Sequence, residues 1–265
     1  MKLRWFRRPP PAVAPPPVGP QARLEAGGTE IFLGGEPYVV TLRGVHASFR
    51  PRTYLEIGTL HGATLKLAHC ASIAVDPEFK LEGDVEGDKP LCLLEQTTSD
   101  DFFATRDPKA LLGRPIDLAF IDGMHHFEIA LRDFFNCERA SHRGSMILLH
   151  DLCPRDAHMT RRHEQLHVQR PTNYKDHWTG DAWKLLPILR EHRPDLTVTC
   201  LDAISTGLVA VTGLDPASTV LPERHDAIVE QWMPVALEDW GVSRLFELCA
   251  FQSAEAWREG LAPVA

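Results

Sequence analysis

Two short stretches of this sequence combine carboxylates and imidazoles at a spacing that could bind a cation. The stretch FIDGMHHF holds Asp122 and, three residues later, His125, while LLHD holds His150 and Asp151. Each aspartate follows an apolar run typical of a strand, and adjacent strands lie ~4.8 Å apart, so the two carboxylates would reach the same point. Oxygen ligands of this kind suit one hard divalent cation, for which Mg²⁺ is the natural choice. The alternative is that both aspartates only form turns, which Gly123 would favour.

The stretch RRHEQLH contains a second pattern that could bind a metal. His163, Glu164 and His167 match H-E-x-x-H, in which a helix sets two imidazoles one turn apart to hold zinc and the glutamate acts as general base. Two arginines precede the match and Arg170-Pro171 follows it, which leaves little apolar face for a buried helix. The chain also has 13 histidines, which raises the chance of an accidental match. A zinc metallopeptidase is therefore the weaker interpretation.

From residue 53 onward the sequence predicts the scaffold that would position these residues. Five short β-rich apolar runs alternate with helical stretches, which include 63–70 and 99–112: TYLEIG, SIAVD, LCLLEQ, IDLAFID and SMILLHD. This alternation predicts a parallel sheet with helices on both faces. After a further helical stretch, GDAWKLLPILREH, the short connection between DLTVTCLD and TGLVAVTG can only join antiparallel neighbours. The predicted fold is α/β, a Rossmann-like, doubly wound, mostly parallel sheet with a C-terminal antiparallel hairpin, followed by surface helices over about 215–265.

In such sheets ligands bind outside the carboxyl ends of the strands, near the point where the strand order reverses. The first strand ends Glu56-Ile57-Gly58 and the chain continues to Gly62, so the glycines would allow a tight turn and a close approach to a ligand. Leu60 occupies the middle position of the dinucleotide fingerprint G-x-G-x-x-G, which argues against a pyrophosphate across this loop.

The ends of the second and third strands offer residues that could bind a nucleoside. Asp76 lies twenty residues after Glu56, at a strand end where nucleoside-binding α/β folds hold a ribose diol. Its alternative role is a helix N-cap, because Pro77 is a favoured first helical residue. The polar cluster Thr98-Ser99-Asp100-Asp101 could contact an adenine or cap the following helix, and capping is the main alternative for Ser99.

Taken together, these motifs resemble those of a known family. E-I-G-x-x-x-G at 56–62, an aspartate at 76, D-G-x-H at 122–125 and H-D at 150–151 are similar to the motifs of class I S-adenosylmethionine-dependent O-methyltransferases. The branch resembled is the metal-dependent one, which includes macrolide-sugar O-methyltransferases and, more distantly, catechol O-methyltransferase and the cephalosporin-hydroxylase-like proteins. The resemblance covers about residues 50–213.

The resemblance implies a role for each motif residue. Asp122 and Asp151 would bind Mg²⁺, and His125 would be the general base. The residues implied to bind S-adenosylmethionine are Glu56, Gly58 and Gly62 around the methionine part, Asp76 on the ribose, Ser99 and Asp100 near the adenine, and Asp122.

These residue types fit the chemistry of methyl transfer to a hydroxyl. A cation lowers the pKa of the hydroxyl and orients it, and an adjacent imidazole takes the proton. We therefore expect an S-adenosylmethionine-dependent O-methyltransferase (EC 2.1.1), assisted by Mg²⁺, that acts on a hydroxyl of a small polar molecule or glycoside. The alternatives are hydroxylase-like or metal-independent methyltransferase chemistry on the same fold, and a non-catalytic cofactor-binding module.

Composition limits the partners and the location. The net charge of −8 and a pI near 5.9 do not predict nucleic-acid binding, and no apolar run approaches the ~18 residues that a transmembrane segment needs. The six cysteines form no C-x-x-C pair, which favours reduced thiols and a cytoplasmic location. The sequence leaves homo-oligomerisation open.

The chain is predicted to consist of a leader and one domain. Residues 1–20 contain four basic residues and seven prolines, which predicts a flexible Pro-rich leader, with a weak membrane-surface or partner contact as the alternative. Residues 21–265 are predicted to form a single class I methyltransferase domain. Within it the basic, histidine-rich stretch at about 152–180 is predicted to be a substrate lid for a polar or anionic acceptor, with a solvated loop as the alternative.

Overall fold

The computed structural model describes residues 19–164 and 177–264 of the protein. The leader predicted at 1–20 therefore lies outside the described residues except for its last two, and so does the centre of the predicted lid, 165–176.

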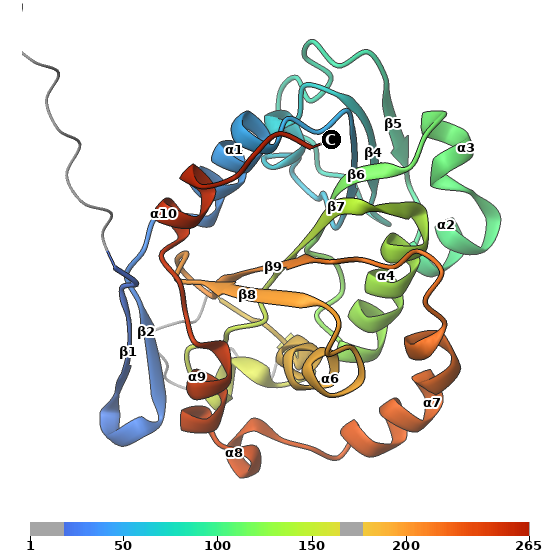
Figure 1. Cartoon of the computed structure of the whole chain (residues 1–265). Helices are drawn as coiled ribbons and strands as arrows, with labels where there is room; N and C mark the ends of the chain where they lie inside the picture. The colour runs from blue at the N-terminus through green and yellow to red at the C-terminus, as the bar shows by residue number, and fades with distance from the viewer. Residues whose placement is uncertain (1–18, 165–176, 265) are drawn as a thin grey trace, which may run out of the picture.

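A seven-stranded sheet in the order β5-β4-β3-β6-β7-β9-β8 forms the centre of the molecule (Figure 1). The first five strands in this order are parallel to one another, and β9 runs antiparallel to both of its neighbours. The predicted α/β fold with a C-terminal antiparallel hairpin is thus confirmed. The strands are β3 (Thr53–Ile57), β4 (Ala71–Val75), β5 (Cys92–Glu95), β6 (Ile116–Ile121), β7 (Ser141–His150), β8 (Thr197–Leu201) and β9 (Leu208–Thr212).

The central strands are buried on both faces of the sheet. In β3, Tyr54 belongs to the core on one face while Leu55 and Ile57 belong to the core on the other, which is the period of two expected of a strand. All residues of β3 and β6 are buried, as expected for parallel strands that are covered by helices on both sides.

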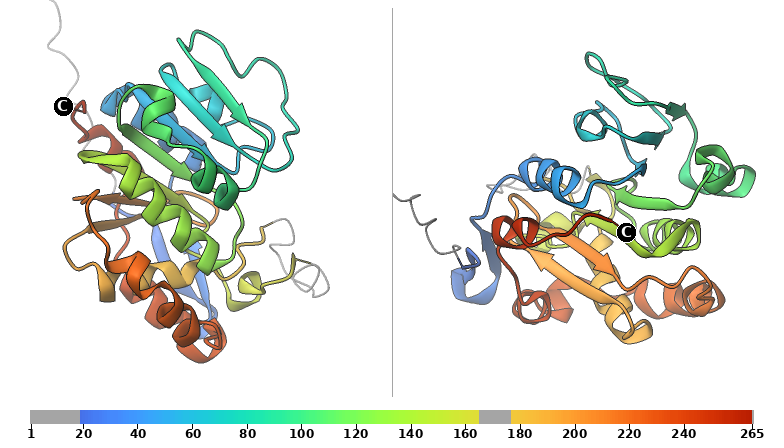
Figure 2. Two further views of the ribbon diagram at one scale, coloured as in Figure 1. Left: turned by 90° about the vertical axis from the view of Figure 1, so that its right-hand side faces the viewer. Right: turned by 45° about the horizontal axis from the view of Figure 1, so that its top comes forward.

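The helices cover the two faces of the sheet (Figure 2). One core contains residues of α1, α10 and a short 3₁₀ helix, and the other contains residues of the remaining α-helices. The α-helices are α1 (Tyr38–Phe49), α2 (Ser99–Thr105), α3 (Pro108–Leu112), α4 (Phe127–Ala140), α6 (Leu185–His192), α7 (Val220–Trp232), α8 (Leu237–Trp240), α9 (Val242–Cys249) and α10 (Ala254–Glu259). Short 3₁₀ helices occupy Ala26–Gly28, Leu65–Leu67, Ala157–Thr160 and Ala182–Lys184.

Two predicted helices are wrong in extent. The helix expected over 63–70 is only the 3₁₀ turn Leu65–Leu67, because the preceding residues form a turn with Gly62 in the left-handed region. The helix expected over 99–112 is two helices, since Pro108 disfavours a helical conformation of Asp107 and the Asp107 side chain caps α3 instead.

The beginning and end of the described chain meet beside the sheet. The strands β1 (Ala22–Glu25) and β2 (Glu30–Leu33) form a separate antiparallel hairpin, and the Ile31 N–H donates to the Arg155 carbonyl in the segment after β7. The buried Asp202 carboxylate, just after β8, accepts hydrogen bonds from the backbone N–H of both Gln21 and Ala254. One side chain therefore joins the N-terminal hairpin to α10.

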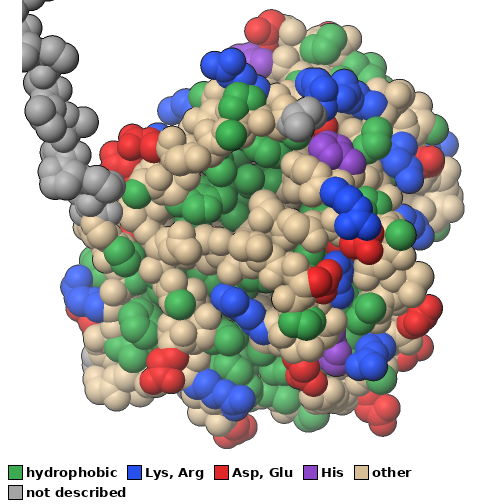
Figure 3. Space-filling model, viewed as in Figure 1, with side chains coloured by type: hydrophobic (Ala, Val, Ile, Leu, Met, Phe, Trp, Pro, Cys, Tyr) green, Lys and Arg blue, Asp and Glu red, His purple; other side chains and the backbone are tan. Residues whose placement is uncertain are grey.

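The surface is mixed in charge. Lysine and arginine side chains lie among aspartates and glutamates over the face shown in Figure 3. Among the described residues, no helix is long and apolar enough to cross a membrane.

A buried ion pair fastens α6 to α4 and gives a test of the packing. Arg193 donates to both Glu138 carboxylate oxygens at 2.6 and 2.9 Å, and both side chains are at most 3% exposed. We expect Arg193→Ala to lower the free energy of unfolding by about 3–5 kcal/mol, because it leaves the buried Glu138 charge unpaired.

Chemical denaturation of the variant and of a control would measure this loss. Arg143→Ala removes an ion pair to Asp215 whose arginine is 80% exposed, and should cost no more than about 1 kcal/mol. Equal losses in the two variants would contradict the assignment of Arg193 to the core.

Candidate active site

Asp122 and Asp151 lie at the carboxyl edge of the sheet, where the strand order reverses. The chain runs outward through β3, β4 and β5 and then returns to β6 on the other side of β3. Asp122 immediately follows β6, and its N–H donates to the carbonyl of Ile57 at the end of β3, at 2.8 Å. Asp151 follows β7, the parallel neighbour of β6. Ligands of doubly wound sheets bind at such a reversal.

His125 closes the space between the two carboxylates. Its Nε2 lies 3.2 Å from Asp151 Oδ2 and 3.6 Å from Asp122 Oδ1. Its Nδ1 lies 3.0 Å from the Trp178 carbonyl, which can only accept, so Nδ1 carries a proton and Nε2 faces the carboxylates. One ligand atom from each of Asp122, His125 and Asp151 lies within 4.8 Å of the others.

A second imidazole, from His150, lies against the same carboxylates. Its Nδ1 is 3.1 Å from Asp122 Oδ1 and 3.4 Å from Asp151 Oδ2, and its side chain is 9% exposed. The ring packs against Tyr38, the first residue of α1, with 4.0 Å between ring centroids.

Burial and neighbouring charges have opposite effects on the pKa values in this cluster. Burial lowers the pKa of His125 and His150, but the carboxylates of Asp151 and Asp122 outweigh it and raise both above the usual histidine value. Burial raises the pKa of Asp151, but His150 and His125 outweigh it and hold the carboxyl well below its usual range. The negative charge of the two carboxylates must therefore be balanced by the imidazole protons, by a bound cation or by hydrogen-bond donors.

Thr206 fixes the orientation of the Asp151 carboxylate. Its hydroxyl donates to Asp151 Oδ1, and both side chains are buried. Asp151 has a φ of 59°, in the left-handed region, so the chain turns sharply directly after β7.

Gly58 brings the loop after β3 against the same edge. Its φ is 84°, and a Cβ placed on it would lie 2.1 Å from the Asp122 carbonyl oxygen. Only glycine allows this approach. Glu56, two residues earlier, is fully buried and accepts a hydrogen bond from the Tyr54 hydroxyl at 2.6 Å on Oε2. Burial raises its pKa to about 7, and its Oε1 has no hydrogen-bond partner among the described residues.

Asp76 and Gly62 also help to shape the loop that follows β3. Asp76 Oδ2 accepts from the Leu60 N–H and Oδ1 from the Glu78 N–H, each at 2.7 Å. No helix follows Asp76, so the N-cap alternative is wrong. Gly62 has a φ of 76° and its Cα faces Val85, whose methyl group would be 2.7 Å from an added Cβ.

Ser99 and Asp100 begin α2, close to α4. Asp100 makes a bidentate ion pair with Arg132, at 2.7 Å for both hydrogen bonds. The cap of α2 is Thr98, whose hydroxyl accepts from the Asp101 N–H, so the capping role considered for Ser99 falls to its neighbour.

The described part of the H-E-x-x-H stretch joins neither group of candidate metal ligands. His163 and Glu164 are exposed and belong to neither of the two ligand groups found in the described part of the chain, and His167 lies outside the described residues. Beside them, Arg162 pairs with Glu128 at 2.6 Å and with Asp181 at 2.7 Å. These contacts connect Arg162, within the predicted lid, to Asp181 directly after the lid and to Glu128 at the start of α4.

Three residues of the site have no signal in the sequence. Tyr38, Trp178 and Thr206 come from segments that carry no recognisable motif, and each reaches the site through tertiary contacts alone. His150 stands inside the H-D motif, but the sequence predicts no role for it.

Substitution of Gly58 tests the close approach of the loop to Asp122. We expect Gly58→Ala to destabilise the protein by clearly more than the ~1–2 kcal/mol that a left-handed alanine costs, because the methyl group would also collide with a carbonyl. Gly87→Ala is the matched control, since Gly87 has a φ of 54° and nothing within 4 Å of its Cβ position. Urea unfolding would compare them, and similar losses would contradict the contact.

Solved structures of several O-methyltransferases align with about two thirds of the chain. O-methyltransferase TomG from Streptomyces achromogenes, involved in tomaymycin synthesis and in complex with S-adenosylmethionine, is 15% identical, with coverage of 67% of this chain and 80% of TomG and a TM-score of 0.48. Methyltransferase PaMTH1 from Podospora anserina, bound to S-adenosylhomocysteine, is 14% identical, with coverage of 67% of this chain and 76% of PaMTH1 and a TM-score of 0.44. An O-methyltransferase from Bacillus cereus in complex with S-adenosylhomocysteine is 15% identical, with coverage of 66% of this chain and 77% of that protein and a TM-score of 0.40. No curated protein matches the sequence.

The family described as "Methyltransferase domain" matches residues 55–152. This range begins in β3 and ends directly after Asp151, so it contains every strand end described above from Glu56 onward. Residues 55–152 are therefore similar to a methyltransferase domain, and this is the part of the chain that contains the motifs at 56–62, 76, 122–125 and 150–151.

Proposed function

We propose that the protein is an O-methyltransferase that transfers a methyl group from S-adenosylmethionine to a hydroxyl of a small polar molecule, with assistance from Mg²⁺. The observation that carries the proposal is the convergence of Asp122, His125 and Asp151 within 4.8 Å beside the loop that follows β3. Two carboxylates and an imidazole at the reversal of a doubly wound sheet provide a cation site next to a nucleoside site.

The residues around the β3 loop fit the cofactor. Oε1 of Glu56 is a buried acceptor without a partner among the described residues, as expected of a group that binds the ammonium of the methionine part. Gly58 leaves room for close approach to the backbone, and Asp76 keeps acceptor capacity for ribose hydroxyls beyond its two backbone hydrogen bonds. Ser99 and Asp100 remain the proposed neighbours of the adenine.

The donor set at the strand ends fits a hard divalent cation. Asp122 and Asp151 would hold it, and when bound it would lower the pKa of the acceptor hydroxyl and orient that group. His125 presents Nε2 to the same point, because its Nδ1 is engaged by the Trp178 carbonyl. The carboxylates raise the pKa of His125, and a cation held by them would offset that effect and leave Nε2 unprotonated. We propose that this atom then receives the hydroxyl proton; its distance from the carboxylates also suits a third ligand of the cation.

The acceptor is proposed to be a ring-shaped polar molecule such as a sugar or glycoside. Two aromatic side chains flank the cation site: Tyr38 against His150, and Trp178 at 5.2 Å between ring centroids from His125. Aromatic faces and nearby polar groups are a common way to bind small polar rings. The six free cysteines support a reducing, cytoplasmic location for this activity.

The second candidate function is hydroxylase-like chemistry on the same fold. The observation that favours it is His150, which adds a second imidazole at 3.1 and 3.4 Å from the carboxylate oxygens. Two imidazoles and a carboxylate are the ligand set of non-haem iron sites. Titration with Fe²⁺ beside Mg²⁺ separates the two candidates, since the proposed function requires that Mg²⁺ binds.

Binding of the nucleoside tests the cofactor assignment. S-adenosylhomocysteine at about a hundred times its Kd should raise the Tm by roughly 5–10 °C. Because Glu56 titrates at about 7 and only its ionised form attracts an ammonium group, affinity should fall as the pH drops below 7, by about tenfold between pH 8 and pH 6. Glu56→Gln should bind weakly at both pH values.

Glu247→Gln is the matched control, because Glu247 is exposed on α9, and it should keep both the affinity and its pH dependence. Affinity would be measured by calorimetric titration. A pH dependence that persists in Glu56→Gln would reject this residue as its source.

Substitution of the proposed ligand side chains tests the cation site and distinguishes the two roles proposed for His125. In protein saturated with S-adenosylhomocysteine, Asp122→Asn should weaken Mg²⁺ binding by at least about tenfold, while nucleoside affinity changes little. His125→Ala should lower kcat by roughly 10²–10⁴-fold with Mg²⁺ affinity retained if the imidazole is the base. Loss of Mg²⁺ affinity in His125→Ala would instead make the imidazole a ligand.

Asp226→Asn controls for the loss of one negative charge, because that carboxylate is fully exposed and lies on α7. Mg²⁺ affinity that is the same in Asp122→Asn and Asp226→Asn would refute the metal role of Asp122.

A further inference from the structure

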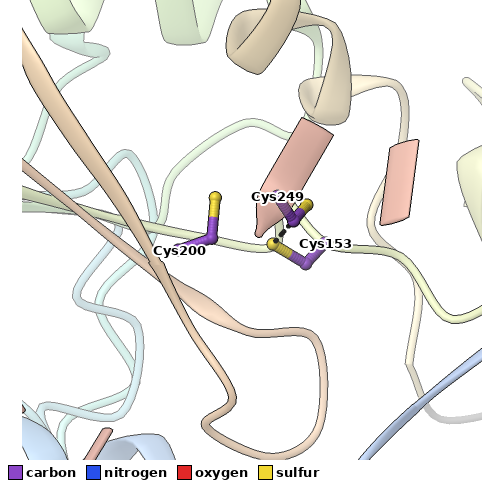
Figure 4. A group of neighbouring side chains, drawn as sticks. All are labelled: Cys153, Cys200 and Cys249. Carbon is purple, nitrogen blue, oxygen red and sulfur yellow. Dashed lines mark hydrogen bonds between the residues drawn. The ribbon is translucent and has the colours of Figure 1, made fainter. Parts of the chain in front are cut away.

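Three cysteine thiols from distant parts of the chain meet inside the protein. Cys153 follows β7, Cys200 lies in β8, and Cys249 is the last residue of α9 (Figure 4). Their sulfur atoms all lie within 4.8 Å of one another, and their side chains are at most 1% exposed. The cluster belongs to neither the proposed cation site nor the nucleoside site.

The spacing of the sulfurs is that of ligands around a single ion. Cys153 Sγ and Cys249 Sγ are 3.8 Å apart. Metal–sulfur bonds of ~2.3 Å at tetrahedral or trigonal angles place two sulfurs about 3.8–4.0 Å apart. A disulfide would use only two of the thiols and would need its sulfurs at ~2.05 Å. The third convergent thiol therefore favours coordination.

The chemical nature of the cluster selects the ion. In the described part of the chain this ligand group contains thiols only, without imidazole or carboxylate, and thiolates prefer soft cations such as Cu⁺ and Zn²⁺ over Mg²⁺. Contacts with Cys153 and Cys249 and the positive charge of Arg190 on α6 lower the pKa of the Cys200 thiol, while the contact with Cys200 and burial raise the pKa of the Cys153 and Cys249 thiols. A cationic side chain nearby also offsets the net negative charge of a metal–thiolate site.

We propose that Cys153, Cys200 and Cys249 form a buried site for one soft cation, Cu⁺ or Zn²⁺, which binds through three thiolates and releases the three thiol protons to solvent. The site does not depend on the proposed function. It would join the segment after β7, the edge strand β8 and the end of α9 through one ion.

The cluster is connected to the strand-end carboxylates through the backbone. The Cys153 N–H donates to the Thr206 carbonyl at 3.0 Å, and the Thr206 hydroxyl donates to Asp151. Gly207 lies against the Cys153 side chain so closely that an added Cβ would be 2.8 Å from its sulfur. An ion held by Cys153 would therefore stiffen the turn that orients Asp151.

Metal binding to the full chain tests the proposal. The reduced protein would carry Asp122→Ala and His125→Ala, so that soft ions cannot bind at the strand-end site, and would be titrated without oxygen with Cu⁺, Zn²⁺ and, as the hard control, Mg²⁺. We expect one Cu⁺ or Zn²⁺ per chain to survive gel filtration against a competing chelator, with thiolate-to-metal absorption and a Tm higher by roughly 5 °C or more. Mg²⁺ should have no effect, and the ion that is retained identifies the natural class.

Variants and thiol labelling assign the ligands. Cys200→Ser should weaken retention at least tenfold, whereas Cys92→Ser, at a partly exposed position outside the cluster, should not. In the chain with all its cysteines, at a urea concentration where the metal-free protein is alkylated at the otherwise buried Cys153, Cys200 and Cys249, bound metal should protect these three thiols and leave Cys92 reactive, which tests the site even if Cys200→Ser folds poorly. The proposal is overturned by no retained ion, by equal retention in Cys200→Ser and Cys92→Ser, or by a Cys153–Cys249 disulfide in the protein before metal is added.

Discussion

The pairing of β6 with β7 is the constraint on which the strand-end site depends. Because the two strands are parallel, both of their carboxyl ends lie at one edge, and the register that sets Ile121 opposite Leu149 sets Asp122 opposite His150. Side chains alternate between the faces of a strand, so a slip of one residue would turn His150 away from Asp122 and bury a different row of residues. The apolar residues of both strands, buried between two layers of helices, therefore fix the position of the polar residues that follow them.

A group of two carboxylates and two imidazoles that is largely buried is stable only because each charge has a partner. Asp151 is held by His125, His150 and the Thr206 hydroxyl, and Asp122 by the same two imidazoles. At low dielectric such interactions are strong, and the loss of any partner leaves a costly unpaired charge. The contacts that balance these charges thus also keep the carboxylates of Asp122 and Asp151 oriented toward a single point.

The sequence allowed the sheet, its C-terminal hairpin and the positions of Asp122 and Asp151 at strand ends to be predicted, because alternation of apolar runs and strand-end polar residues are local patterns. Prediction from the sequence failed where a neighbouring residue could take the same role, and where long-range contacts determine which residues meet. Thr98 rather than Ser99 caps α2, and Pro108 divides one expected helix into two. Tyr38 and Thr206 reach the site from segments far away in the chain, and the meeting of Cys153 with Cys200 and Cys249 depends on how α9 packs on the sheet. No spacing in the sequence encodes these contacts.

The Asp202 carboxylate, which accepts from Gln21 and Ala254, has a consequence for how the chain folds. Its two partners are 181 and 52 residues away in sequence, and the hairpin that contains β2 also bonds to Arg155, 124 residues after Ile31. Loops of this length close late, after the local contacts of the sheet and helices have formed. The N-terminal hairpin is synthesised long before Arg155 and Asp202, so it can dock only after those residues are in place. The N-terminal hairpin should therefore join the folded core late.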